Sequence, residues 1–142
     1  MYRGSALIAA AGLLALQAFA DDRAAVVPWE ALGKVTLVKN NDGYLPQFSK
    51  ELIAMDKAQV KLKGFMMPLE PAATQKRFLL TAVPPECGFC LPGGPDQLVE
   101  VHAKQGVMYV LDPITVSGKL VLVRDDAGGL LYRLTDAVAI LK

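Results

Sequence analysis

The sequence has little of what catalytic and nucleic-acid-binding proteins use. It contains one histidine, and its 15 basic residues nearly balance its 14 acidic ones. With one histidine and no clustered pair of acids, general acid–base catalysis has few candidate residues. The Gly-x-Ser-x-Gly, P-loop and His-Glu-x-x-His motifs are missing. No basic stripe is present to neutralise phosphates, so a nucleic-acid partner is not expected. These absences favour a binding module over an enzyme.

The longest apolar run lies at the N-terminus and predicts export. Arg3 precedes an uninterrupted apolar segment at residues 6–16, and Ala18-Phe19-Ala20 has the small-x-small form of a cleavage site. The run is too short for a comfortable membrane span. We therefore expect a cleavable signal peptide at residues 1–20, with an uncleaved anchor as the alternative. Residues 21–142 are then expected to form a single β-rich periplasmic domain with no stable membrane span.

The second half of the chain predicts about five strands with little helix between them. Residues 59–70 begin with alternating polar and apolar positions, residues 77–83 are mostly apolar, and residues 97–103 alternate again. Residues 114–124 and 130–134 flank an Asp-Asp-Ala-Gly-Gly turn. Because the connections are too short for crossover helices, a βαβ fold is excluded.

The first half predicts two short helices. Residues 28–33 read as a single helical turn, with an early proline and a final glycine. Ser49 is a candidate N-cap for a helix that ends near Met55. We expect residues 39–46 to form a loop around an Asn-Asp-Gly turn. Trp29 is interpreted as a structural residue that plugs the core under a barrel.

Two glycines interrupt predicted strands at matching places. Gly64 follows Val-x-Leu-x, and Gly118 follows Ile-x-Val-x. A glycine inside a strand suggests a bulge or a bend at a barrel corner. The fold class is therefore all-β with one or two short helices. We predict a small five-stranded barrel of the OB type, with a β-sandwich as the alternative architecture.

The most distinctive segment is the loop Pro84–Pro95, which holds both cysteines in a Cys-x-x-Cys spacing. The proline and glycines after the second cysteine prevent the helix that thioredoxin-like proteins place there. In an oxidising compartment the cysteines can form a lasting disulfide, worth roughly 2 kcal/mol for so short a loop. We interpret the loop as a disulfide-clipped surface presented to a partner. The expected contact residues are Cys87, Phe89, Cys90, Pro92, Gly93 and Gly94.

The same thiols leave a second interpretation open, in which the protein is a soft-metal carrier or a thiol redox protein. Cys87 and Cys90 with Met66 or Met67 would suit copper(I), because thiolates and thioethers select that ion. With His102 the thiolates would form part of a zinc site, which normally needs four ligands. The simpler roles are apolar packing for the methionines and an exposed strand position for the histidine. No cofactor is certain, and copper or zinc is the candidate.

A set of short motifs extends from Trp29 to Leu134. It comprises Gly64-Phe65-Met66-Met67-Pro68-Leu69-Glu70, Phe78-Leu79-Leu80, the Cys-containing loop, and Asp112-Pro113 before the strand that holds Gly118. Together these motifs resemble the exported bacterial proteins grouped as domain-of-unknown-function family 3299. The resemblance implies a periplasmic β-rich domain, sometimes encoded near transport or metal-homeostasis genes, with no established activity. We therefore expect a non-enzymatic binding or accessory domain whose partner is another envelope protein.

The loop departs from the pattern of that family. Many members have one cysteine, a nearby histidine and a proline run before a glutamine. Cys87 and Gln97 fit this frame, but Phe89 stands in place of the histidine, Cys90 is additional, and glycines replace prolines. A metal site that relies on that histidine therefore does not transfer to this chain.

Overall fold

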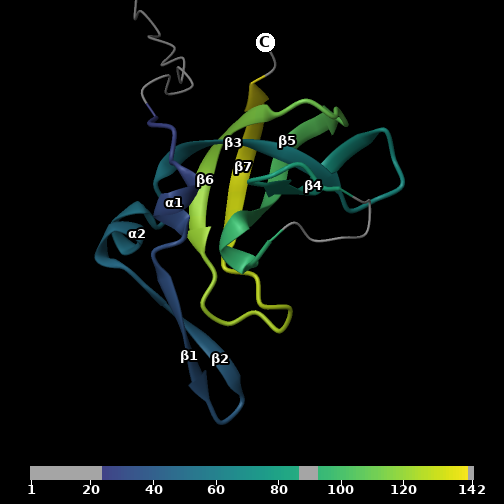
Figure 1. Cartoon of the computed structure of the whole chain (residues 1–142). Helices are drawn as coiled ribbons and strands as arrows, with labels where there is room; N and C mark the ends of the chain where they lie inside the picture. Colours follow the sequence, from purple (N-terminus) through teal and green to yellow (C-terminus); the bar gives the residue numbers. More distant parts are fainter. Residues whose placement is uncertain (1–23, 87–92, 141–142) are drawn as a thin grey trace, which may run out of the picture.

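Five strands of the chain close into a barrel. The computed structural model describes residues 24–86 and 93–140, and the strands follow the order β3-β4-β5-β7-β6 around the barrel (Figure 1). Strands β5 and β7 run parallel, and the other neighbouring pairs are antiparallel. The strands are β3 (Gln59–Pro68), β4 (Thr74–Thr81), β5 (Leu98–Met108), β6 (Ile114–Leu122) and β7 (Tyr132–Ile140).

This arrangement confirms the prediction of a small five-stranded barrel. The mixed strand order is the one found in OB folds. The alternative of a β-sandwich is wrong, because β6 pairs back onto β3 and closes all five strands into one sheet.

Two short helices and a hairpin precede the barrel: α1 (Trp29–Leu32), β1 (Val35–Asn40), β2 (Gly43–Phe48) and α2 (Lys50–Met55). Both predicted helices are confirmed, and the side-chain oxygen of Ser49 caps α2 by accepting a hydrogen bond from the Leu52 amide at 3.3 Å. A 3₁₀ turn, η1 (Pro95–Gln97), precedes β5. In the part of the chain that the structure describes, no helix is long and apolar enough to cross a membrane.

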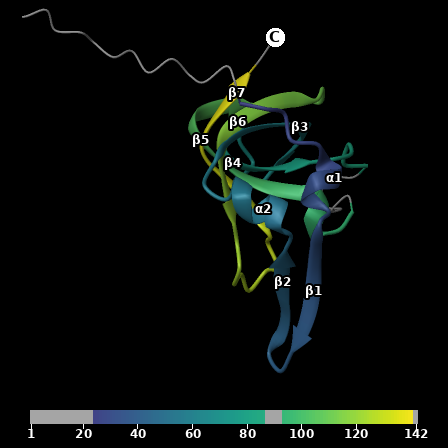
Figure 2. The ribbon, with the colours of Figure 1, turned by 90° about the vertical axis from the view of Figure 1, so that its left-hand side faces the viewer.

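The prediction of a loop over residues 39–46 is wrong, because β1 and β2 form an antiparallel hairpin there. The two strands pair along their whole length, and Asn40 pairs with Gly43 at the turn. Two views of the ribbon show the hairpin projecting away from the barrel (Figures 1 and 2). Gly43 and Pro46 are typical loop residues in a sequence, but a proline is compatible with the outer edge of a strand.

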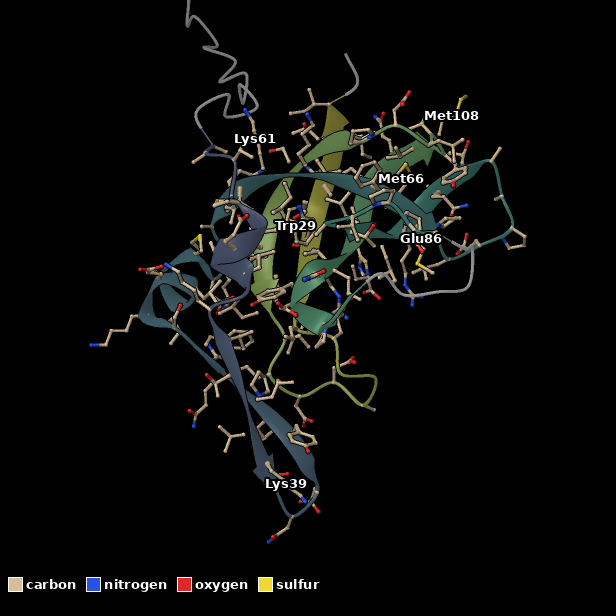
Figure 3. The ribbon with its side chains drawn as sticks, in the orientation of Figure 1. Trp29, Lys39, Lys61, Met66, Glu86 and Met108 are labelled. Atoms are coloured by element: carbon tan, nitrogen blue, oxygen red, sulfur yellow. The ribbon has the colours of Figure 1, made fainter. Side chains whose placement is uncertain are left out.

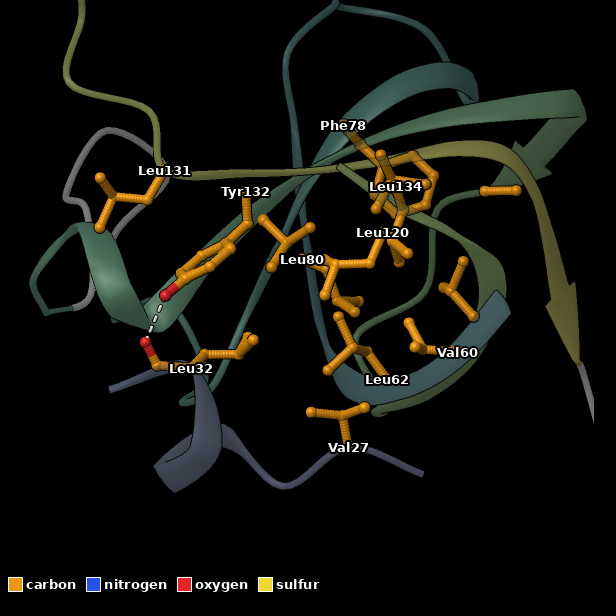
Figure 4. Close-up of a cluster of buried hydrophobic side chains, with 14 of the residues drawn as sticks. Val27, Leu32, Val60, Leu62, Phe78, Leu80, Leu120, Leu131, Tyr132 and Leu134 are labelled. Atoms are coloured by element: carbon orange, nitrogen blue, oxygen red, sulfur yellow. Dashed lines mark hydrogen bonds between the residues drawn. The ribbon is translucent and has the colours of Figure 1, made fainter. Parts of the chain in front are cut away.

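Inward-pointing side chains from all five strands fill the barrel (Figure 4). Phe78, Leu134 and Tyr132 are fully buried. The Tyr132 hydroxyl donates a hydrogen bond to the carbonyl oxygen of Leu32, which ties α1 to the barrel. Burial raises the pKa of Tyr132 far above its ordinary value, and the negative charge of Asp96 adds to the effect.

Gly64 marks the place where β3 changes its partner. Up to Gly64 the strand pairs with β6, and from Phe65 onward it pairs with β4. A Cβ atom at Gly64 would lie 2.5 Å from the carbonyl oxygen of Thr81 and 3.1 Å from Cζ2 of Trp29. The Trp29 ring packs against the core, and its Nε1 donates to the carbonyl oxygen of Lys63 at 2.8 Å. The glycine predicted at a barrel corner thus lies where the strand changes neighbours, and Trp29 covers this corner.

The second glycine of this kind, Gly118, lies opposite a bulge in β7. Its two neighbours on β6 pair with Val138 and Thr135, so β7 carries one extra residue at this point. Asp136 within the bulge has a φ of 51°, which is unusual for a residue other than glycine. A Cβ atom at Gly118 would lie 3.1 Å from the Thr135 carbonyl oxygen. The close approach of the two backbones therefore favours glycine here.

Candidate functional site

One outer face of the barrel, formed by β4, β5 and β7, carries a group of charged side chains. Alternate residues of β5 fill the core, which puts Glu100 and His102 on the outer face. The strand register places Arg77 of β4 beside His102, and Arg133 of β7 beside Glu100. We call Arg77, Glu100, His102 and Arg133 the charged cluster.

Glu100 is the centre of the charged cluster, and its side chain is 11% exposed. Arg133 Nε donates to Glu100 Oε1 at 2.8 Å, and His102 Nε2 lies 2.5 Å from the same oxygen. Arg77 Nε lies 3.4 Å from Oε2. The side chains of these three partners are between 31% and 59% exposed. A nearly buried carboxylate thus holds three accessible donor groups in place.

Two opposing effects set the protonation of Glu100. Burial disfavours the charged carboxylate and raises its pKa. Hydrogen bonds from Arg133 and His102, together with their charges, favour the carboxylate and outweigh the burial. The net result is a pKa below the ordinary value of 4.5, so Glu100 is ionised at neutral pH.

The charged cluster has more positive than negative charge. With His102 neutral, two guanidiniums face one carboxylate, and protonation of the histidine adds a further positive charge. Among the described residues, neither Arg77 nor Arg133 makes a side-chain hydrogen bond or ion pair to an acceptor other than Glu100, so terminal amino groups remain available. Guanidinium groups bind carboxylates and phosphates through paired hydrogen bonds. The arrangement can therefore bind an anion with arginines that Glu100 orients.

The Cys-containing loop joins the same two strands, β4 and β5, and its base is held by hydrogen bonds. The Ala82 amide donates to the carbonyl oxygen of Gln97 at 3.0 Å. The hydroxyl of the buried Thr81 donates to the carbonyl oxygen of Val83 at 2.8 Å. On the other side, the Gln97 amide donates to the carbonyl oxygen of Gly94 at 3.0 Å. The loop therefore starts and ends on a fixed base beside the charged cluster.

Two predicted contact residues, Gly93 and Gly94, belong to the described end of this loop. Gly93 has a φ of 93°, a conformation that favours glycine, and a Cβ atom there would lie 2.2 Å from Oε1 of Gln97. Gly94 has a φ of −82°, which other residues adopt, and it precedes η1. The backbone therefore requires glycine at the first position only.

The other predicted contact residues, Cys87, Phe89, Cys90 and Pro92, lie outside the described residues. The disulfide and the Cys-based metal or redox site therefore stay predictions.

The described candidates for a metal site are distributed over different places. Met66 and Met67 are neighbours on β3 and therefore point to opposite faces of the sheet. Met66 is 2% exposed and belongs to the hydrophobic core, whereas Met67 is 8% exposed and lies outside the core cluster. Figure 3 labels Met66 among the side chains of the barrel. His102 contacts Glu100 on β5. Within residues 24–86 and 93–140, no group of three or more His, Cys, Asp or Glu side chains is placed to hold a metal ion.

Three members of the charged cluster, Arg77, Glu100 and Arg133, were not predicted from the sequence as site residues. Glu100 was available as a signal, because a single acid interrupts the apolar positions Leu98, Val99 and Val101 of a predicted strand. A charge in such a place is rarely buried without a partner. Arg77 and Arg133 could not be assigned as those partners, because their proximity depends on the strand order of the barrel.

The fold and this face define a β-barrel protein of the OB type with a positively charged outer face beside a loop whose two ends are held by hydrogen bonds. The chain matches the model of the family "Protein of unknown function (DUF3299)" over residues 24–137, and it belongs to this family. The predicted family resemblance is thus confirmed. A crystal structure of a DUF3299 family protein from Pseudomonas aeruginosa PAO1 is similar, with 26% identity, a TM-score of 0.49 and coverage of 68% of each chain. No match was found among curated proteins.

Proposed function

We propose that this protein is an exported, non-enzymatic binding module that holds an acidic segment of another envelope protein. The contact surface consists of the charged cluster and the adjoining loop Pro84–Pro95. The partner belongs to an envelope system for transport or metal handling, which is the setting that the family resemblance implies. The observation that carries the proposal is the excess of positive charge around Glu100, next to a loop with a fixed base.

The position of the charged cluster supports this proposal. OB-type barrels commonly bind their ligands on the outer face of their second and third strands, which correspond to β4 and β5 here. The correspondence with OB-type barrels concerns the fold alone. The chemistry of the residues supplies the specific part, because two arginines oriented by a buried carboxylate match a ligand carboxylate.

A synthetic peptide of alternating glutamate and serine, labelled with a fluorophore, provides a direct test. Binding is measured by fluorescence anisotropy with the wild-type protein and with two variants. Arg77→Gln removes a positive charge of the charged cluster, and the control Lys50→Gln removes a positive charge that is also exposed but lies on α2. We expect Arg77→Gln to weaken binding roughly tenfold, the effect of losing one charge-assisted hydrogen bond. Equal affinities of the two variants, or equal binding of a lysine–serine peptide, would contradict the proposal.

The role of the loop is tested separately. We expect that the double substitution Cys87→Ser and Cys90→Ser leaves the barrel folded, as judged by circular dichroism, and weakens peptide binding. A thiol count with and without mild reductant, followed by metal analysis, distinguishes the two interpretations of the cysteines. A resistant disulfide without metal supports the clipped loop. Free thiols that carry copper or zinc, or a readily opened disulfide, would instead favour the metal or redox function.

A further inference from the structure

The β1–β2 hairpin exposes apolar side chains that a two-stranded sheet alone does not cover. Leu37 is 44% exposed, Val38 39%, Tyr44 66% and Leu45 45%. Within the described residues 24–86 and 93–140, both strands pair only with each other, and the hairpin forms a sheet separate from the barrel. An isolated two-stranded hairpin is marginally stable in water, and its free edges are open to further pairing. The hairpin therefore has both the apolar surface and the backbone groups of an interaction site.

The outer edge of β2 is not suited to pairing. In an antiparallel hairpin with a two-residue turn, the pair next to the turn is hydrogen-bonded, and the pairs then alternate. Counting from Asn40 and Gly43, Pro46 falls in a non-hydrogen-bonded pair with Leu37, so its nitrogen faces the outer edge of β2. A proline nitrogen has no hydrogen to donate, so it interrupts any ladder on this side.

The hairpin also borders the connection between β6 and β7. Leu37 of β1 and the β2 residues Tyr44, Leu45 and Pro46 line a groove of about 210 Å³ together with residues 123–126 and 129–131 of this connection. Figures 1 and 2 both show β2 on the side of the connection and β1 on the side away from it. Pro46 and the neighbouring connection therefore hinder an added strand at the edge of β2, whereas no other strand of the described residues pairs with the edge of β1.

The outer edge of β1 presents a regular row of backbone groups. By the same alternation, Val35, Leu37 and Lys39 direct their amide and carbonyl groups away from β2. The strand contains no proline, and Lys39 is its one charged residue. An extended segment can thus pair with β1 over three alternate residues.

We propose that β1 pairs with β1 of a second copy of this chain, in antiparallel orientation about a two-fold axis at Leu37. This register opposes Leu37 to Leu37 of the partner copy, Val35 to Lys39, and Thr36 to Val38. Residues with outward backbone groups oppose each other, which the antiparallel ladder requires. The result is a four-stranded sheet with the order β2-β1-β1-β2.

The side chains of β1 favour this occupant. Opposed like charges are destabilising in a sheet, and here each Lys39 faces Val35 rather than the other lysine. β-Branched residues such as Thr36 and Val38 pack well across paired strands. A two-fold interface uses the same patch on both subunits, and the sequence of β1 is compatible with itself in this way. The pairing also raises the sheet to a size that is stable in water.

The test is the oligomeric state of the purified protein, measured by analytical ultracentrifugation over a concentration series. We expect a monomer–dimer equilibrium for wild type. Leu37→Asp places two carboxylates opposite each other at the axis, and we expect the dissociation constant to rise at least tenfold. Leu45→Asp is the matched control, because it introduces the same charge on β2 at an almost equal exposure, and it should leave the equilibrium nearly unchanged.

A mixing experiment makes the test specific for the two-fold axis. Leu37→Asp and Leu37→Lys are each expected to be monomeric alone, and an equimolar mixture should form a heterodimer because opposite charges then face each other. This rescue also excludes simple misfolding of the hairpin as the cause of dissociation. A wild-type monomer up to millimolar concentration, equal effects of Leu37→Asp and Leu45→Asp, or no rescue on mixing would each overturn the proposal.

Discussion

Large apolar and aromatic side chains are buried in the barrel, but several in the hairpin are exposed. Tyr132 in the barrel is fully buried and its hydroxyl is hydrogen-bonded to Leu32, whereas Tyr44 in the hairpin is 66% exposed. Phe78 is fully buried, and Leu37 is 44% exposed. The difference comes from closure, because each barrel strand has two neighbours and shares an enclosed interior. Burial is thus decided by the number of neighbouring strands and not by the hydrophobicity of the residue alone.

This contrast predicts that the barrel determines the stability of the protein and that the hairpin contributes little to it. The hairpin is attached through α1 and α2, and its described contribution to the main core is limited to its base, where Phe48 belongs to the core cluster and Val35 packs against it. The apolar side chains beyond this base, such as Leu37 and Tyr44, are exposed and therefore remain available for an interaction. Substitutions in the barrel and in the hairpin test this division.

Truncation in the core should have the largest effect. We expect Phe78→Ala to lower the free energy of unfolding by about 3–5 kcal/mol, because it removes a fully buried ring and leaves a cavity. Leu37→Ala is expected to change it by less than about 0.5 kcal/mol, as for other exposed positions. Urea unfolding followed by circular dichroism at low micromolar concentration measures both. A comparable loss in the two variants would mean that the hairpin belongs to the cooperative core.

A substitution at the barrel corner should come next. A methyl group at Gly64 would lie 2.5 Å from a backbone oxygen that cannot move without shifting β4. We expect Gly64→Ala to destabilise the protein by about 1–3 kcal/mol in thermal or urea unfolding. In Gly118→Ala the new methyl group would lie 3.1 Å or more from its nearest neighbours, so the loss of stability should be smaller. Equal losses at the two positions would contradict the assignment of Gly64 to the tighter contact.

Removal of the Tyr132 hydroxyl tests the link between α1 and the barrel. We expect Tyr132→Phe to cost about 1–3 kcal/mol, because the Leu32 carbonyl loses its partner in a buried place. Burial raises the pKa of Tyr132 above the ordinary value of 10.0. The contribution of the neutral hydroxyl to the free energy of unfolding is therefore complete below pH 10, and it is lost at higher pH because the tyrosine ionises more readily in the unfolded chain. The variant should show less alkaline destabilisation. Tyr44→Phe, measured in the same way, should behave as wild type.

The barrel and its corners were predictable from the sequence because their signals are local. The alternation that starts at residue 59, the glycines at positions 64 and 118, and the N-cap at Ser49 each follow from short-range rules. The strand β2 was missed because Gly43 and Pro46 carry the chemistry of a loop, and only their pairing with β1 makes them part of a sheet.

The charged cluster could not be predicted for a different reason. Its members come from β4, β5 and β7, and the sequence distance between Arg77 and Arg133 gives no sign that they share a carboxylate. The parallel pairing of β5 with β7 brings them together, and this pairing is a property of the closed barrel. Glu100 alone, a charge among apolar strand residues, carried a local signal that something would have to neutralise it.

The smallest of these stability effects concerns the acid limb of the pH profile. Because the folded-state pKa of Glu100 lies below 4.5, its contribution to stability is complete above this pH and is lost as the pH falls through the folded-state pKa. We therefore expect Glu100→Gln to reduce the dependence of the unfolding midpoint on pH below about pH 5. The matched control is Glu51→Gln next to the hairpin, where the ion pair with Lys34 is more than half exposed and contributes little.

An unchanged acid limb in Glu100→Gln, or an equal change in Glu51→Gln, would mean that the buried position of Glu100 does not set the acid stability of the barrel. The same variant also connects stability to binding. Glutamine still accepts a hydrogen bond but carries no charge, so it holds the two arginines more weakly than the carboxylate does. The net positive charge of the cluster increases at the same time. If orientation matters more than charge, Glu100→Gln weakens binding of the acidic peptide; if charge alone matters, binding becomes tighter. The sign of this change therefore tells whether the charged cluster is a built site or only a region of positive potential.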